Sequence, residues 1–137
     1  MLCSLPDANT ADFDWLCFDA SGQLLLCSDG NGKGFNIFRI ASGRLARHFD
    51  EPAHCISRGG EWLADVASER AIPGIRIWRQ DSPKRAVVLG AGLRGTSKAK
   101  FSPDGRRIAW GTSDGTVLVA EMADVFQRLK QLGLGWR

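Results

Sequence analysis

The chain of 137 residues is 44% hydrophobic and 24% charged, which is the balance of a folded protein and argues against intrinsic disorder. Its 18 Lys and Arg residues and 15 Asp and Glu residues leave a formal net charge of +3, spread along the chain without the basic blocks typical of nucleic-acid or anionic-membrane binding. No run approaches the ~18 to 20 apolar residues of a membrane helix, so neither nucleic acid nor a membrane is an expected partner.

The N-terminal residues 1–7 have neither the basic start nor the long apolar core of a secretory signal, so a cytoplasmic location is expected. Four cysteines, Cys3, Cys17, Cys27 and Cys55, stand far apart without a C-x-x-C pair, and three of them lie in apolar, strand-like runs. This pattern favours reduced, packed cysteines over a disulfide or metal role.

Short apolar runs bounded by turn residues predict strands at residues 24–27 and 108–110, each buried on both faces. Polar and apolar residues alternate over 97–101, which predicts a strand with one solvated face. Residues 45–49 and 87–89 are the expected outer strands of two sheets. Near the N-terminus, Asp12, Asp14 and Asp19 belong to an alternating segment and are interpreted as solvated edge charges.

Two turns stand out in the C-terminal third. In the segment Phe101-Ser102-Pro103-Asp104-Gly105, proline presets φ and Gly105 suits a left-handed conformation, which predicts a tight turn. Asp114-Gly115 lies between two apolar runs and predicts a two-residue hairpin turn.

After Met122 the apolar period changes to that of a helix. Val125, Phe126, Leu129 and Leu132 share one face of a helix predicted over residues 124–132. Asp124 with Gln127 predicts a capping box, and Gly133 a C-terminal cap. We expect this helix to replace the fourth strand of the last sheet and to pack its apolar face there.

The residues 101–119, FSPDGRRIAWGTSDGTVLV, resemble one repeat of a WD40 β-propeller. Two weaker copies precede it at the spacing of ~40 residues expected of such blades, at residues 18–39 and 56–79. The resemblance implies an all-β fold of about three four-stranded antiparallel blades, a partial β-propeller, with a short C-terminal α-helix. The expected boundaries are about 13–50, 53–90 and 95–122 for the blades and about 124–132 for the helix, all within one repeat domain spanning 1–137.

The repeats depart from the family pattern where it usually has a Trp-Asp pair. Phe38, Trp78 and Ala120 occupy the Trp slot, and Arg39, Arg79 and Glu121 the Asp slot, so the family's buried hydrogen-bonding tetrad is expected to be incomplete in every copy. The ending at residues 132–136 resembles tails that follow the last repeat of large bacterial signalling proteins. That likeness identifies the chain with the C-terminal three repeats of a bacterial-type WD40 protein.

No spacing in the chain predicts a catalytic, cofactor or metal site. The glycine-rich residues 30–34 lack the Lys-Ser/Thr pair of a phosphate loop and lead into a strand, so a hairpin loop is expected there. A calcium loop starting at Asp29 is rejected because Lys33 stands where a ligand oxygen belongs. His48 and His54 make no recognisable zinc spacing with the cysteines. We therefore expect no enzyme activity, no cofactor and no metal.

The resemblance implies a non-catalytic scaffold that binds other proteins, with one rim of loops holding the partner. The contact residues that it suggests are Asp29, Lys33, Glu69, Arg70, Arg94 and Asp114. An alternative is a C-terminal regulatory or sensor module of a larger bacterial signalling enzyme, such as a kinase or protease fusion. Because three blades are too few to close a ring, we also expect either self-association through the side of the first blade or association with further blades of a longer propeller.

Overall fold

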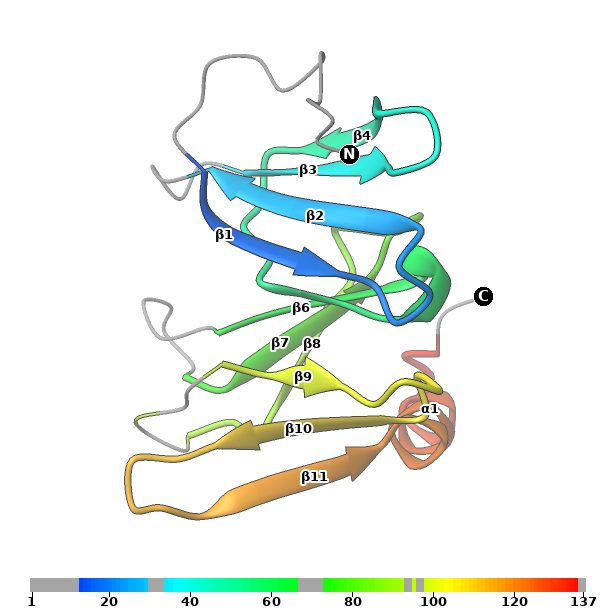
Figure 1. Ribbon diagram of the computed structural model, residues 1–137. Coiled ribbons are helices and arrows are strands. Elements are labelled where there is room, and N and C mark those ends of the chain that lie inside the picture. Colours follow the sequence, from blue (N-terminus) through cyan, green and yellow to red (C-terminus); the bar gives the residue numbers. More distant parts are fainter. Residues whose placement is uncertain (1–12, 30–33, 67–72, 93–94, 96–97, 136–137) are drawn as a thin grey trace.

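Three antiparallel β-sheets follow one another along the chain, and an α-helix comes after the last sheet (Figure 1). The structure is a computed structural model, and it describes residues 13–29, 34–66, 73–92, 95 and 98–135. Sheet 1 consists of β1 (Phe13–Phe18), β2 (Leu24–Asp29), β3 (Phe35–Arg39) and β4 (Arg44–Phe49), hydrogen-bonded in that order. The predicted outer strand at residues 45–49 is therefore confirmed.

Sheet 2 repeats this arrangement. Its strands are β5 (Cys55–Ile56), β6 (Trp62–Val66), β7 (Ile75–Arg79) and β8 (Ala86–Leu89), with the 3-10 turn η1 (Arg58–Gly60) between the first two. Sheet 3 has β9 (Lys100–Phe101), β10 (Arg107–Gly111) and β11 (Val117–Glu121), and α1 (Met122–Gln131) follows where the other sheets have a fourth strand. The fold class expected from the sequence is confirmed.

The same turn joins the first two strands of every sheet. It covers residues 19–22, 57–60 and 102–105, and in each copy the fourth N–H donates to the first carbonyl, at 2.9, 3.0 and 2.8 Å. The first side chain accepts the N–H five residues later: Asp19 from Leu24 at 2.9 Å, Ser57 from Trp62 at 2.9 Å and Ser102 from Arg107 at 3.0 Å. A short oxygen-bearing side chain is thus the common requirement of this turn.

Two apolar layers hold the sheets together. The first lies between sheets 1 and 2 and contains Leu26, Ile37, Leu63 and Trp78, among others. The second lies between sheets 2 and 3 and contains Ala64, Ile77, Ile108 and Trp110, with Met122 of α1. Because neighbouring residues of a strand point to opposite faces, sheet 2 is covered on both sides, which explains its nearly continuous apolar strands.

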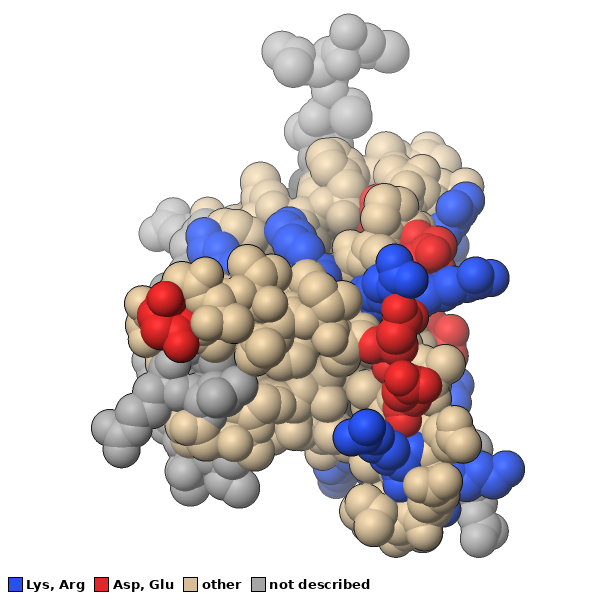
Figure 2. Space-filling view, turned by 90° about the horizontal axis from the view of Figure 1, so that it is seen from below, with Lys and Arg blue, Asp and Glu red and all other residues tan. Residues whose placement is uncertain are grey.

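Both end sheets expose some apolar side chains on their outer faces. Leu16 and Phe18 of β1 are 58% and 62% exposed, and Val117 and Val119 of β11 are 71% and 60% exposed. Viewed from below, from the side of β11 in Figure 1, charged side chains of both signs gather along one edge, and the middle of the face carries few of them (Figure 2).

The hairpin at Asp114-Gly115 differs from the prediction. Thr112 N–H donates to Thr116 O at 2.9 Å, and Gly115 N–H donates to Thr112 O at 3.1 Å. The loop therefore has three residues, 113–115, with Gly115 at φ 86°. The usual three-residue hairpin loop is a tight turn followed by a residue in the left-handed conformation. Gly115 is the third residue of this loop, whereas in a two-residue loop it would be the second.

The helix caps are partly as predicted. At the C-terminus, Leu134 N–H donates to Leu129 O at 2.8 Å and Gly133 N–H to Lys130 O at 3.1 Å, with Gly133 at φ 71°. This is a Schellman motif, which confirms the glycine cap. The capping box at Asp124 and Gln127 is wrong, because β11 runs directly into the helix at Met122 and the N-cap residue, Glu121, makes no side-chain cap hydrogen bond.

The cysteines that the structure describes, Cys17, Cys27 and Cys55, are free and buried. Burial raises the pKa of the Cys27 and Cys55 thiols to about 11, which keeps both protonated at neutral pH. Their interpretation as packing residues is confirmed. Within the described ranges, no helix combines the length and apolar character that crossing a membrane requires.

Candidate functional site: a pocket between sheet 2 and the C-terminal helix

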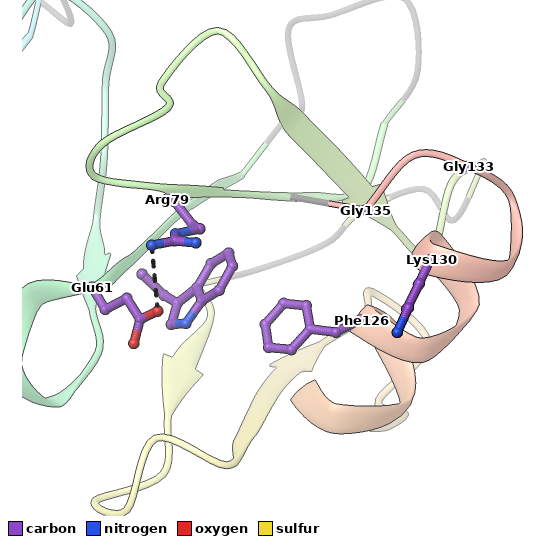
Figure 3. Close-up of a pocket in the computed structure, with 7 residues that line it drawn as sticks. Glu61, Arg79, Phe126, Lys130, Gly133 and Gly135 are labelled. Carbon is purple, nitrogen blue, oxygen red and sulfur yellow. Dashed lines mark ion pairs between the residues drawn. The ribbon is translucent and has the colours of Figure 1, made fainter. Parts of the chain in front are cut away.

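A pocket of about 690 Å³ lies where sheet 2 meets α1, and we call it the tail pocket. Its walls come from the start of β6, the end of β7, one face of α1 and the turn that follows the helix (Figure 3). The residues that line it are Glu61, Trp62, Arg79, Phe126, Lys130, Gly133 and Gly135. It therefore joins two parts of the chain that are far apart in sequence.

Two aromatic rings form one wall of the tail pocket. Phe126 of α1 stacks on Trp62 of β6, with ring centroids 4.5 Å apart and an interplanar angle of 25°. The backbone at Trp62 is fixed because its N–H donates to the Ser57 hydroxyl, in the turn that recurs in every sheet. Trp62 is 8% exposed and Phe126 is half-buried, so this pair offers a small apolar contact area with little loss of side-chain entropy on binding.

Of the charged groups of the pocket, Arg79 lies over the Trp62 ring. Arg79 is the cross-strand partner of Trp62, and its guanidinium carbon lies 5.7 Å from the centre of the indole ring. Its Nη2 lies 2.9 Å from Asp81 Oδ2 and 3.9 Å from Glu61 Oε1, the contact drawn as a dashed line in Figure 3. The Arg79 Nε is buried and has no hydrogen-bond partner. Lys130 projects from the next turn of α1 beyond Phe126.

This set of side chains offers both apolar and charged contacts. The described lining contains an aromatic pair, two cations, one carboxylate and two glycines, and it includes no Ser, Thr, Cys or His side chain that could act as a nucleophile or base. An apolar wall with a few charged groups at its edge is the usual composition of a site for a protein side chain.

A second cluster of charged groups is buried inside sheet 2. Asp65 and Arg76 are cross-strand partners, each about 5% exposed, with Oδ2 and Nη2 3.8 Å apart. Arg76 Nη1 also donates to Glu51 Oε2 at 2.6 Å, and its guanidinium carbon lies 4.3 Å from the centre of the Trp78 ring. His54 Nδ1 lies 2.5 Å from Asp65 Oδ1. We interpret this cluster as structural, because its groups bond one another and join β6, β7 and the segment between β4 and β5.

The histidine and carboxylate in this cluster resemble two members of a catalytic triad, so their surroundings are relevant. The His54 ring packs edge-on against Trp15, with centroids 6.3 Å apart. Within the described part of the chain, no three or more His, Cys, Asp or Glu side chains are grouped closely enough to hold a metal ion. His48 is on the surface, where its nitrogens face Asn36 Oδ1 at 2.7 Å and Asp50 Oδ1 at 3.2 Å.

The rim residues predicted from the sequence are only partly covered by the structure. Asp29 ends β2 and is paired with Phe13, while its side chain, Lys33, Glu69, Arg70 and Arg94 lie outside the described residues. Asp114 lies in the β10–β11 loop, where its Oδ1 accepts from Thr112 Oγ1 at 2.5 Å and from Thr116 N–H at 2.9 Å. These hydrogen bonds, above all that from the Thr112 hydroxyl, lower the pKa of Asp114 to about 2. All six contacts stay a prediction.

One sequence interpretation near these sites is wrong. Asp19 is not a solvated edge charge but is 3% exposed, because its carboxylate accepts hydrogen bonds inside the first turn and from Gly59 N–H of sheet 2 at 3.0 Å. The tail pocket was not predicted from the sequence. Its only signal was the apolar face of the helix with Phe126, since nothing in the sequence pairs that face with Trp62.

Among solved structures, the fold is similar to the β-propeller domain of Cps50 (Swd1) from Myceliophteria thermophila, with a TM-score of 0.54 and 16% sequence identity. The fold is a partial β-propeller. The match covers 83% of this chain and 37% of that one, so the chain spans well under half of the propeller it resembles. No protein-family model and no curated protein matches the sequence. At this identity the likeness concerns the fold alone.

Proposed function

We propose that this protein is a non-catalytic scaffold, built of WD40-like repeats, that binds a segment of another protein in the tail pocket. The observation that carries the proposal is the Trp62–Phe126 stack beside Arg79 and Glu61, in a pocket of about 690 Å³ whose described lining includes no Ser, Thr, Cys or His. A peptide side chain can pack on the rings while its polar backbone meets the charged edge. The β-propeller fold supports this reading, because it presents pockets and loops on a rigid framework.

The proposal is tested by selecting peptides from a random phage-displayed library on the immobilised protein and measuring the Kd of the synthesised winners by fluorescence polarisation. Lys130→Glu changes the charge of the pocket at an exposed helix position and should change Kd by about fivefold or more. Arg44→Glu makes the same charge change at an exposed position in sheet 1 and should leave Kd as in the wild type. If no peptide is enriched over a folded control protein, or if the two variants bind alike, the tail pocket is not the binding site.

A further inference from the structure

A second candidate site lies at the opposite side of sheet 2, where the first strands of the three sheets meet. The strands β1, β5 and β9 contact one another in turn. Trp15 of β1 spans them, and its indole Nε1 donates to the carbonyl of His54, directly before β5, at 2.7 Å. The indole also packs edge-on against the His54 ring. Residues of two sheets therefore hold this ring in one orientation.

Two lysines of sheet 3 converge on the same ring. Lys98 Nζ lies 3.8 Å and Lys100 Nζ 5.6 Å from the centre of the Trp15 ring. Both lysine side chains are exposed, while Ala99 between them is buried, as the predicted alternation requires. An ammonium group this close to an indole face is attracted by the ring quadrupole, so the aromatic platform collects both cations in one place.

Neither lysine has an anionic partner among the described residues, whereas the arginines Arg76, Arg79 and Arg107 each pair with a carboxylate. Both ammonium groups therefore lack a counter-charge in that part of the chain, and a bound anion supplies one while it gains charge-assisted hydrogen bonds. Each ammonium has three N–H donors, so donors remain for an anion that approaches from solvent.

We propose that Lys98 and Lys100 on the Trp15 platform form a binding site for the carboxylates of an acidic segment of a protein partner. The inference extends the proposed function, since it rests on the partner being a protein and adds the chemistry of a second contact. It commits to an acidic peptide rather than a nucleic acid for a structural reason. Lys98 already covers a face of the indole, and single-stranded nucleic acids need open aromatic faces on which their bases stack.

Lys98, Lys100 and Trp15 together are called the lysine platform, and this site lies apart from the tail pocket. β9 begins on the side of the molecule where β2 and β10 end, whereas α1 and the turn after it lie on the other side (Figure 1). An extended partner could therefore contact either site without the other. Failure of the tail pocket and failure of the lysine platform are distinguishable, because each is tested by its own charge-reversed variants.

The test uses a fluorescein-labelled Glu₈ peptide and the full chain. We expect binding that weakens with added salt and a Kd raised about fivefold or more by Lys98→Glu or Lys100→Glu. Arg44→Glu, an equal charge change at an exposed position in sheet 1, should leave Kd within about twofold. Lys98 lies outside the strand, so its variant should keep the fold even if Lys100→Glu weakens β9.

A spectroscopic measurement locates the contact. In a two-dimensional ¹H–¹⁵N spectrum, the Trp15 indole resonance is the one that Trp15→Phe removes. It should shift on adding Glu₈, while the Trp62 indole resonance should not. Equal weakening by all three charge-reversed variants would show unspecific attraction, and a shift at Trp62 would place the peptide in the tail pocket. If a single-stranded oligonucleotide with eight phosphates bound more tightly than Glu₈, the partner would be a nucleic acid rather than an acidic peptide. Each of these results overturns the proposal.

Discussion

The carboxylate of Asp19 accepts a hydrogen bond from the backbone N–H of Gly59 at 3.0 Å, which ties the first turn of sheet 1 to the equivalent turn of sheet 2. The same carboxylate accepts the N–H groups of Ser21, Gln23 and Leu24 and the Ser21 hydroxyl. One buried side chain thus closes its own turn and joins two sheets. Its equivalents Ser57 and Ser102 close their turns with a hydroxyl.

Asp19 should make the stability of the protein depend on pH. Burial acts to raise its pKa, but hydrogen bonds from Ser21, Gly59 and Leu24 prevail and lower the pKa to about 2 from an ordinary value of 3.8. The carboxylate is therefore more acidic in the folded state, so its stabilisation of about 2 kcal/mol is complete above pH 4 and is lost as the pH falls towards 2. Asp19→Asn should reduce the free energy of unfolding by about this amount at pH 7 and less at low pH. Urea titrations of both proteins over this range measure the difference, and a constant difference would contradict the assignment.

Arg76 should be far more important for stability than an exposed arginine in an equivalent cross-strand pair. Arg76→Ala leaves Asp65 buried without its cation, which should cost about 3 to 5 kcal/mol. Arg107 pairs with Glu121 across β10 and β11, but both side chains are solvent-exposed, so Arg107→Ala should cost less than about 1 kcal/mol. Chemical denaturation of the two variants under identical conditions gives the comparison. Similar costs would mean that the buried cluster is not structural.

The glycine of the third turn should be required for its backbone conformation alone. Gly105 has φ 71°, and a Cβ placed there would meet no atom within 4 Å. Gly105→Val should therefore lower stability by about 1 to 2 kcal/mol through strain, without a steric clash. Gly105→Asn should cost less, because asparagine tolerates a left-handed conformation. Thermal melts of both variants and of the wild type test this. A melting midpoint of Gly105→Val equal to that of the wild type would show that the backbone strain is negligible.

Phe126 and Leu132 should differ although both lie on the predicted apolar face of the helix. Phe126 stacks on Trp62, so Phe126→Ala should destabilise the protein by about 1.5 to 3 kcal/mol. Leu132 is 71% exposed, because the helix ends at Gln131 and Leu132 leaves its axis as the C-cap residue. Leu132→Ala should change stability by no more than about 0.5 kcal/mol. A larger effect at Leu132 than at Phe126 would reverse the packing described for α1.

The outer face of sheet 3, rather than the first blade expected from the sequence, should mediate self-association. The cross-strand pairs Leu26–Ile37 of sheet 1 and Ala64–Ile77 of sheet 2 hold equivalent positions and are fully buried under the next sheet. The pair at the same position in sheet 3 is Ala109–Val119, where Val119 is 60% exposed. We expect a second copy to cover it, with a mass by light scattering above the 14.9 kDa of one chain.

A matched pair of variants tests which surface is responsible for association. Val119→Lys should restore the single-chain mass, whereas Leu132→Lys, which removes another exposed apolar side chain elsewhere, should not. A wild-type protein that stays at 14.9 kDa at all concentrations would refute the expectation.

Local sequence determined the elements of this fold and their order. Apolar runs, turn residues and the change of period after Met122 depend on neighbours a few positions apart, and they predicted the outer strands at residues 45–49 and 87–89, the turn at 102–105 and the glycine cap at Gly133. Two predictions were wrong, the N-terminal capping box and the two-residue hairpin loop. In both places hydrogen bonds shift an element by one or two residues, as when β11 runs straight into α1. Local patterns do not resolve such shifts.

Only the tertiary structure decided which side chains meet across the sheets. Asp19 belongs to an alternating, polar segment, yet it is buried and accepts a hydrogen bond from the N–H of Gly59, which is 40 residues away. Trp62 and Phe126, or Trp15 and Lys98, belong to different repeats, and their contact depends on how one sheet stacks on the next. Stacking is set by the summed packing of whole faces rather than by any one segment, so neither the tail pocket nor the lysine platform could be read from the order of residues.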